Sequence, residues 1–241
     1  MKSFTYLLLA LLGWAAQPAA AQATRELTEA RTLYAQANRD PGMTMLRAGL
    51  VSQMSGFFGD GSLQPGAIRT LDSRYRPVPG LRFHAGLRLL EVQDSINLDS
   101  THLWPVGTLR GFELGERGGP TPVRHFRSRL VKEGSAGMRR DFVEVLTAVD
   151  AGPLLLAWLY SSGADAAAGR LSFEPLLLVG AGSNPTEPLH PLELSQTNVL
   201  KLFGSRAGDV GGYAMRQDLK YFRAEDVAKM LDYYNQRAVV K

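Results

Sequence analysis

The spacing of apolar and polar residues changes along the chain, and a strand-like period of two dominates from Leu81 to about Leu194. The stretch LRFHAGLRL, which starts at Leu81, has an apolar residue at nearly every second position. The stretches TLRGFELG, PVRHFRSRLVK and DFVEVLTAV follow as short runs rich in Val, Phe and Leu, separated by Gly and Pro. This pattern predicts a series of short β-strands.

The clearest strand pair is DFVEVLTAVDAGPLLLAWLYSS, in which two apolar runs flank Asp150-Ala151-Gly152. We expect a hairpin here. Its second arm is apolar at consecutive positions from Leu154 to Tyr160, so both of its faces carry apolar side chains and Trp158 is expected in the core. Such a strand lies inside a sandwich, in a barrel wall or under a helix. The stretches GRLSFEPLLLVG and EPLHPLEL are the next strands, and their order favours an antiparallel meander.

A helical period precedes and follows this region. ATRELTEARTLYAQAN repeats apolar residues at three- and four-residue spacing and ends at Asp40-Pro41-Gly42. SQTNVLKLFG begins with a capping serine and ends at Gly204. RAEDVAKMLDYYNQ is an amphipathic helix, and Asn235 is suited to close it. Its apolar stripe consists of Val227, Met230, Leu231 and Tyr234.

These patterns predict an α+β fold with a curved antiparallel sheet, arranged as a meander over roughly residues 81–194. C-terminal helices pack on the sheet, and an N-terminal helix precedes it. The expected organisation is a signal peptide at 1–21, an N-terminal helix with a Gly/Pro-rich lead at 22–80, and the sheet with its C-terminal helical element at 81–241.

The N-terminal segment has the composition of a secretory signal peptide. Lys2 is followed by the apolar run Tyr6–Ala16 and by the small residues Ala19-Ala20-Ala21. The apolar run is shorter than the roughly 20 residues of a membrane-spanning helix. We therefore expect an exported protein, periplasmic or extracellular, with cleavage after Ala21. The alternative is an uncleaved N-terminal anchor.

The chain contains 0 cysteines, so neither disulfides nor thiolate metal ligands are available to it. Its four histidines, at 84, 102, 125 and 190, have no metal-binding spacing. Gly180-Ala181-Gly182 resembles the start of a nucleotide-binding loop, but the prolines at 185, 188 and 191 are incompatible with the helix that such a loop requires. No catalytic residue, metal or cofactor is expected.

Basic residues are concentrated in VRHFRSRLVKEGSAGMRR. They are Arg124, Arg127, Arg129, Lys132, Arg139 and Arg140. In a strand, Arg127 and Arg129 would share one face, while Phe126 and Leu130 would share the other. The commoner explanation is a solvated outer face of a half-exposed strand. The alternative is a binding site for an anionic partner. For an exported protein, an anionic glycan or envelope component fits this alternative better than nucleic acid.

The C-terminal half resembles a group of uncharacterised exported proteins common in Bacteroidetes-type Gram-negative bacteria. The resemblance covers about residues 80–236. It rests on the strand pair RRDFVEVLTAVDAGPLLLAWLYSS, then LSFEPLLLVG, NVLKLFGSRAGDV and LKYFRAEDVAKMLDYYNQ. It implies the fold and export, and it carries no known activity or functional residues. At the N-terminal end the chain departs from that group, whose members often have an early β-segment.

The sequence therefore favours a non-enzymatic envelope or secreted protein that binds a partner through its sheet or its basic face. The alternative is a hydrolase that acts on envelope or extracellular material through a carboxylate site. The candidates for such a site are Glu91, Asp94 and Asp99 in EVQDSINLDS.

Export is directly testable. N-terminal sequencing of the protein recovered from the periplasm or the medium is expected to begin at or next to Gln22, because the small-residue site ends at Ala21. A recovered protein that still begins with Met1 would identify the segment as an anchor.

Overall fold

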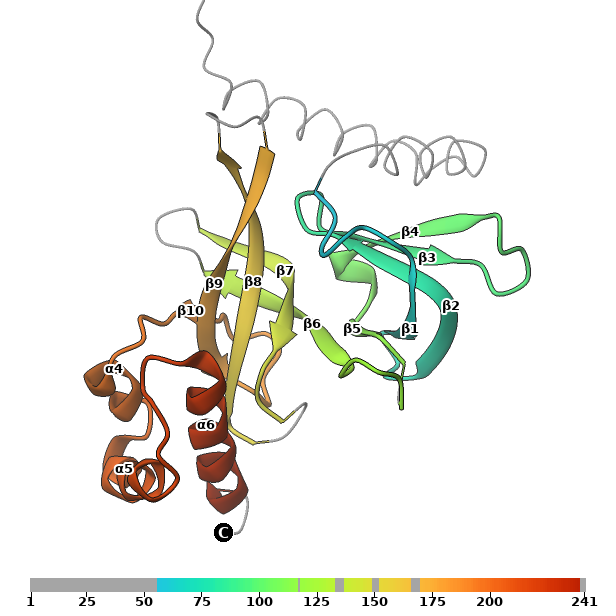
Figure 1. Cartoon of the computed structure of the whole chain (residues 1–241). Coiled ribbons are helices and arrows are strands. Elements are labelled where there is room, and N and C mark those ends of the chain that lie inside the picture. The colour runs from blue at the N-terminus through green and yellow to red at the C-terminus, as the bar shows by residue number, and fades with distance from the viewer. Residues whose placement is uncertain (1–55, 117, 133–136, 149–151, 166–169, 239–241) are drawn as a thin grey trace, which may run out of the picture.

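The computed structural model describes residues 56–116, 118–132, 137–148, 152–165 and 170–238. The expected signal peptide and the expected N-terminal helix lie outside these residues. Within them the fold is α+β: one 10-stranded sheet followed by helices at the C-terminal end. Figure 1 shows the helices at one end of the molecule, beside β8 and β9, and the strands β1 to β4 at the other end.

All neighbouring strands of the sheet pair antiparallel, in the order β10-β9-β8-β7-β6-β5-β1-β2-β3-β4. The strands β5 to β10 form a meander, as the sequence predicts, and β1 to β4 form a second one that joins it where β1 pairs with β5. The bounds are β1 Gln64–Arg69, β2 Tyr75–His84, β3 Leu89–Gln93, β4 Thr101–Pro105, β5 Gly111–Leu114, β6 Arg124–Lys132, β7 Met138–Val145, β8 Leu154–Asp165, β9 Arg170–Ala181 and β10 His190–Pro191.

The sheet begins earlier than the period change at Leu81 indicates, because β1 and the first part of β2 fall within the expected lead. Pro77 and Pro79 lie in β2, where they hide the strand from a pattern search. Proline is tolerated there because the ladder between β2 and β3 starts only at Leu81, so this part of β2 has an open edge.

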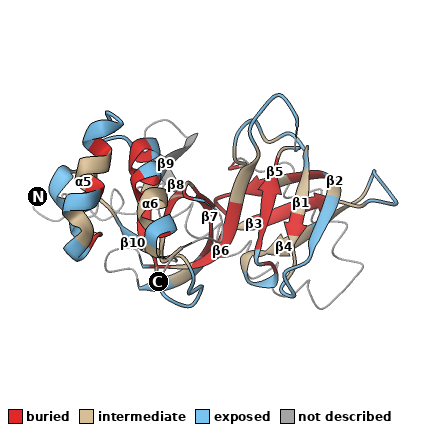
Figure 2. Ribbon diagram, turned by 90° about the horizontal axis from the view of Figure 1, so that it is seen from below, coloured by how far each residue is buried: buried red, intermediate tan, exposed pale blue. Residues whose placement is uncertain are grey.

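The strand β6 is shared by two halves of the sheet. The first half contains β1 to β5, and the second contains β7 to β10. On one side, Phe126 packs into an aromatic core with Phe83, Phe112 and Phe142, formed with β1 to β5. On the other side, Val131 packs against β7, β8 and β9 in an aliphatic core. Figure 2 shows buried residues along β5 and β6 in the middle of the molecule.

The second half closes into a ring through Leu189. Its N–H donates to the carbonyl of Leu130 (2.8 Å), and its own carbonyl accepts from the N–H of Lys132 (2.9 Å). The adjoining strand β10 pairs with β9, so the segment around Leu189 links β9 to the free edge of β6. A closed sheet has no exposed edge in this half.

The apolar arm of the predicted hairpin is β8, and side chains on both of its faces pack into hydrophobic cores. Leu155, Ala157 and Leu159 face the aliphatic core. Leu156 faces a third core, which the C-terminal helices cover. The strand is thus both part of a ring wall and covered by helices. Trp158 is only half-buried at the margin of the helix-covered core, less than the sequence predicts.

Three α-helices follow β10: α4 Gln196–Lys201, α5 Ala207–Arg216 and α6 Ala224–Ala238. Short 3-10 turns lie between β4 and β5 (η2, Val106–Thr108) and between α4 and α5 (η3, Gly204–Arg206). Ser195 caps α4, and its hydroxyl accepts from the N–H of Asn198 (3.2 Å). The predicted stripe of α6 packs on β8 and β9: Val227, Met230 and Leu231 are fully buried, and Tyr234 packs at the edge.

Asn235 does not close α6, because the helix continues to Ala238. Its buried carboxamide instead pairs with the main chain of Leu154 at the start of β8. The amide nitrogen donates to the carbonyl of Leu154 (2.7 Å), and the amide oxygen accepts from its N–H (3.0 Å). Gly152 lies directly against this side chain, since a Cβ there would come within 2.3 Å of Asn235. Asn235 therefore fastens the helix to the sheet.

Replacement of Asn235 by Ala is expected to lower the free energy of unfolding by about 2–4 kcal/mol, because it leaves two main-chain groups of Leu154 without their partners. Urea denaturation measures this loss. The matched control is Gln236→Ala, on the exposed side of the same helix, which is expected to change stability by under about 0.5 kcal/mol. Equal effects of the two substitutions would contradict the role of Asn235.

Candidate functional site

Two rows of cross-strand partners lie side by side on one face of β2, β1, β5 and β6. The first row runs Tyr75, Arg69, Gly111, Arg127, and the second runs Pro77, Ala67, Glu113, His125. Directly opposed residues in antiparallel strands project from the same face. Residues of the two rows are two positions apart along each strand, about 7 Å.

Gly111 leaves a gap in the first row between Arg69 and Arg127. A Cβ at Gly111 would lie 2.1 Å from the carbonyl oxygen of Phe126, so only glycine fits the close approach of β5 to β6. Between Arg69 on β1 and Arg127 on β6, the β5 position of this row therefore carries no side chain.

A pocket of about 540 Å³ adjoins this row, next to the connection between β9 and β10. Its lining combines five arginines with small and apolar residues and one hydroxyl-rich loop. We call it the arginine pocket, and its arginines are Arg69, Arg110, Arg127, Arg129 and Arg140. Among the described residues that line it, none is acidic.

Arg129 is nearly fully buried, with 4% of its surface exposed, and it binds the loop that closes the pocket. Its guanidinium donates to the carbonyls of Ala181, Gly182 (3.1 Å) and Asn184 (2.8 Å). These bonds hold the guanidinium of Arg129 in place beneath the loop.

Arg127 is equally buried and joins the two rows. It donates to the carbonyl of Phe126 (3.0 Å) and to the hydroxyl of Tyr75 (3.1 Å). One of its nitrogens lies 3.7 Å from the carboxylate of Glu113, which His125 also contacts at 3.1 Å. Glu113 offsets part of the charge of Arg127 from outside the pocket lining.

The remaining arginines stand at the mouth. Arg110 donates to the carbonyl of Leu71 (2.7 Å), and Arg140 lies 3.4 Å from the carbonyl of Ser128. Both are exposed, whereas Arg69 is partly buried and stacks on the ring of Tyr75 at 5.4 Å. Charges arranged from a buried floor to an exposed mouth attract anions into the pocket.

Of the six basic residues that the sequence singles out, Arg127, Arg129 and Arg140 line the arginine pocket. The other three lie elsewhere. Arg124, on the opposite face of β6, binds Glu144 and Tyr160, Arg139 pairs with Asp141 (3.2 Å), and Lys132 is exposed at the end of β6.

The commoner explanation of Arg127 and Arg129, a solvated outer face, is wrong, since both are buried under neighbouring chain segments. The sequence reasoning also missed Arg69 and Arg110. No local signal marks these two arginines, because only the pairing of β1 with β5 and β6 brings them to Arg127.

The Gly-x-Gly stretch lies at the end of β9: Gly180 and Ala181 belong to the strand, and Gly182 begins the connection to β10. No helix follows it directly, as the prolines after it indicate. Its role lies instead in the pocket wall, to which it contributes Gly182 and Ser183 together with Pro185 and Thr186. The resemblance to a nucleotide-binding loop is therefore a resemblance of sequence only.

The carboxylates of EVQDSINLDS serve local structure. Glu91 is buried and accepts from Arg82 (2.7 Å) and Thr101 (2.8 Å). Asp94 caps the β3–β4 turn, and its pKa is lowered to about 2 because the N–H groups of Asn97 and Ile96 donate to it. Asp99 is exposed in the same turn. Among the described residues, no group of three or more His, Asp or Glu is placed to hold a metal ion.

No protein-family profile, curated protein or solved structure matches the chain. In the part of the chain that the structure describes, no helix is both long and apolar enough to cross a membrane.

Asp141 lies opposite Arg129 on β7 and is 3% exposed. Burial raises the pKa of its carboxyl to about 6, although Arg88 and Arg139 act to lower it. The folded protein therefore holds this proton more tightly than the unfolded chain does. The stabilisation is complete below about pH 4 and is lost as the pH rises through about 6.

Relative to the variant Asp141→Asn, the wild type is expected to lose roughly 2–3 kcal/mol of unfolding free energy between pH 4 and pH 7. Urea denaturation of both proteins at each pH measures this difference. A difference that stays constant with pH would contradict the raised pKa.

Proposed function

We propose that this chain is an exported, non-enzymatic binding protein that holds an anionic group of a glycan or envelope component in the arginine pocket. The signal-peptide composition of the N-terminal segment supports export. The arginine pocket supports binding of the anion at one defined site, as opposed to binding over the whole basic face of the sheet.

One observation carries this proposal: five arginines line a single pocket whose described lining residues include no acidic side chain. Glu113 offsets part of the charge of Arg127, and Asp141 lies opposite Arg129 on β7. A bound anion would relieve the repulsion that remains among the five guanidinium groups. Planar guanidinium groups also fit the oxygens of phosphate, sulfate and carboxylate with paired hydrogen bonds.

The size of the pocket restricts the ligand. A volume of about 540 Å³ is typical of a small-molecule site, and it admits one end group or one short unit of a larger molecule. Single-stranded nucleic acid is usually bound along a longer basic groove with several aromatic platforms. An isolated anionic group therefore suits this pocket better than a nucleic-acid strand does.

Inorganic phosphate and pyrophosphate are expected to bind the wild type in low-salt buffer. Arg110→Gln and Arg140→Gln should each weaken binding about tenfold, because each removes a charged hydrogen-bond donor at the mouth. Isothermal titration calorimetry measures the affinities. Both residues are exposed, so the variants are expected to fold normally.

The matched control is Arg216→Gln, which removes the same charge from the exposed end of α5, outside the residues that line the pocket. It is expected to leave the affinity within about twofold, because exposed charges at a distance are screened. Equal weakening by Arg110→Gln and Arg216→Gln, or no binding of any anion by the wild type, would disprove the proposal.

A further inference from the structure

Beyond the rest of the sheet, the strands β8 and β9 continue as a two-stranded ribbon. The strand β7 pairs with β8 only as far as Leu159. The strands β8 and β9 stay paired from Tyr160 opposite Pro175 to Asp165 opposite Arg170, and we call these residues the ribbon. Figure 1 shows the ribbon projecting past β7. Among the described strands, no third strand pairs with it. Since a two-stranded sheet is only marginally stable by itself in water, the ribbon needs a further contact.

The pairing register divides the ribbon into an apolar face and a polar face. Directly opposed residues of antiparallel strands share a face. The apolar face therefore holds Tyr160, Ser162, Ala164, Leu171, Phe173 and Pro175. The opposite face holds polar residues and Gly163. A contiguous apolar face of this kind is typical of a surface that another element covers.

The first described residues of the chain lie at the base of this apolar face. The ring of Phe58 packs on the ring of Tyr160, with their centroids 4.7 Å apart. The N–H of Phe58 donates to the carbonyl of Phe83 (2.8 Å), and the carbonyl of Gly56 accepts from the N–H of Ala85 (3.0 Å). The chain that precedes Gly56 therefore starts beside the point at which the ribbon leaves the sheet.

The preceding segment, MTMLRAGLVSQMS at residues 43–55, lies outside the described residues, but its sequence has a helical period. Met43, Leu46, Leu50 and Met54 recur at intervals of three and four residues. A helix from Met43 to Met54 would be about 17 Å long, at about 1.5 Å per residue. The β8 edge of the ribbon, from Tyr160 to Asp165, is also about 17 Å long, at about 3.3 Å per residue. The segment and the ribbon therefore match in length.

We propose that residues 43–55 form a helix whose apolar stripe packs on the apolar face of the ribbon. Its covalent attachment keeps the segment at a high effective concentration beside the ribbon. A short helix and a two-stranded ribbon are each marginal alone in water, so packing one on the other stabilises both. With Met54 at the base of the ribbon, the matching lengths bring Leu50 to Ser162 and Leu46 to Ala164.

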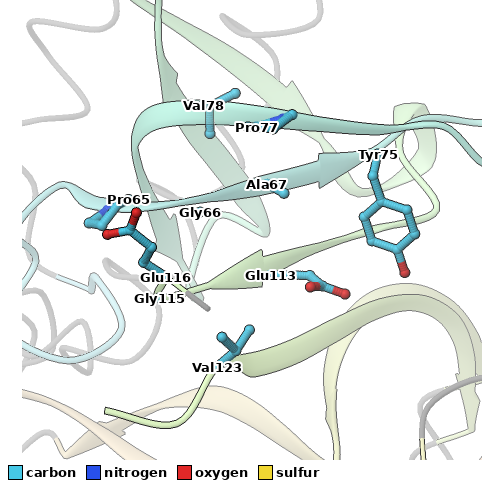
Figure 3. A pocket seen from close by; sticks show the side chains of 10 residues that line it. All are labelled: Pro65, Gly66, Ala67, Tyr75, Pro77, Val78, Glu113, Gly115, Glu116 and Val123. Atoms are coloured by element: carbon cyan, nitrogen blue, oxygen red, sulfur yellow. The ribbon is translucent and has the colours of Figure 1, made fainter. Parts of the chain in front are cut away.

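The contact with Phe58 lies on the opposite face of the sheet from the pockets. Phe58 packs on Phe126 (5.5 Å between ring centroids), whereas Arg127, the next residue of β6, projects to the other face. That other face carries the arginine pocket and a second pocket of about 480 Å³, where Figure 3 shows Tyr75 and Glu113. Packing of the segment on the ribbon therefore leaves the proposed anion site open.

Because the chain itself contains no cysteine, a pair of introduced cysteines reports the contact directly. The test pair is Leu50→Cys with Ser162→Cys, on the apolar face. The matched control is Leu50→Cys with Ser161→Cys, because Ser161 is the adjacent serine on the polar face. Mild oxidation of the purified protein is expected to give about tenfold more intramolecular disulfide in the test pair, since a disulfide forms only where the two Cα atoms lie within about 7 Å. Peptide mass mapping without reductant measures both yields.

The same oxidation in urea should remove the difference between the two pairs, and Leu46→Asp added to the test pair should lower its yield several-fold. Equal yields in the folded test and control pairs, or no intramolecular disulfide in either, would overturn the proposal. Disulfide-linked dimers as the main product of the test pair would also overturn it, and would identify a second copy of the chain as the occupant of the apolar face.

Discussion

The guanidinium of Arg129 holds three main-chain carbonyls of the β9–β10 connection against β6, and the closed half of the sheet is organised around this contact. The same connection carries Leu189, whose main-chain bonds complete the ring. Because Arg129 is buried, these oriented acceptors help to stabilise its charge. The β9–β10 connection is thereby fixed against β6 and forms one wall of the arginine pocket.

The position of β6 explains why charge and aromatic packing occur on one strand. Phe126 faces the aromatic core, whereas Arg127 and Arg129 face the other half of the sheet and the pocket. The two halves therefore cannot separate without exposing both sets of side chains. Two of the five arginines of the proposed binding site, Arg127 and Arg129, therefore lie on a strand that contributes to both cores, and pre-organised donors lose little entropy when an anion binds.

The sequence predicts the fold where the apolar period is regular. The hairpin around Gly152, the apolar faces of β8 and the stripe of α6 all follow from it. Two parts could not be read in this way. The prolines of β2 conceal a strand that is tolerated only because its edge is open, a property of the assembled sheet. Likewise, the segment rich in arginine is visible, but its burial depends on a distant loop, and Arg69 and Arg110 join it only through strand pairing. The sequence predicts Asn235 as a helix cap, because a local motif cannot reveal a bond to the main chain of Leu154.

Gly111 offers a way to recognise other proteins built like this one. The carbonyl of Phe126 excludes any side chain at that position, and the arginines on either side of it come from strands far apart in the chain. In related proteins, these three positions should therefore vary together. A glycine would be kept on β5, and a basic residue would be kept opposite it on each of the two neighbouring strands. Distant relatives that share the proposed binding site would keep this spatial triplet even after overall similarity has faded, whereas relatives that share only the architecture would keep the glycine and lose the arginines.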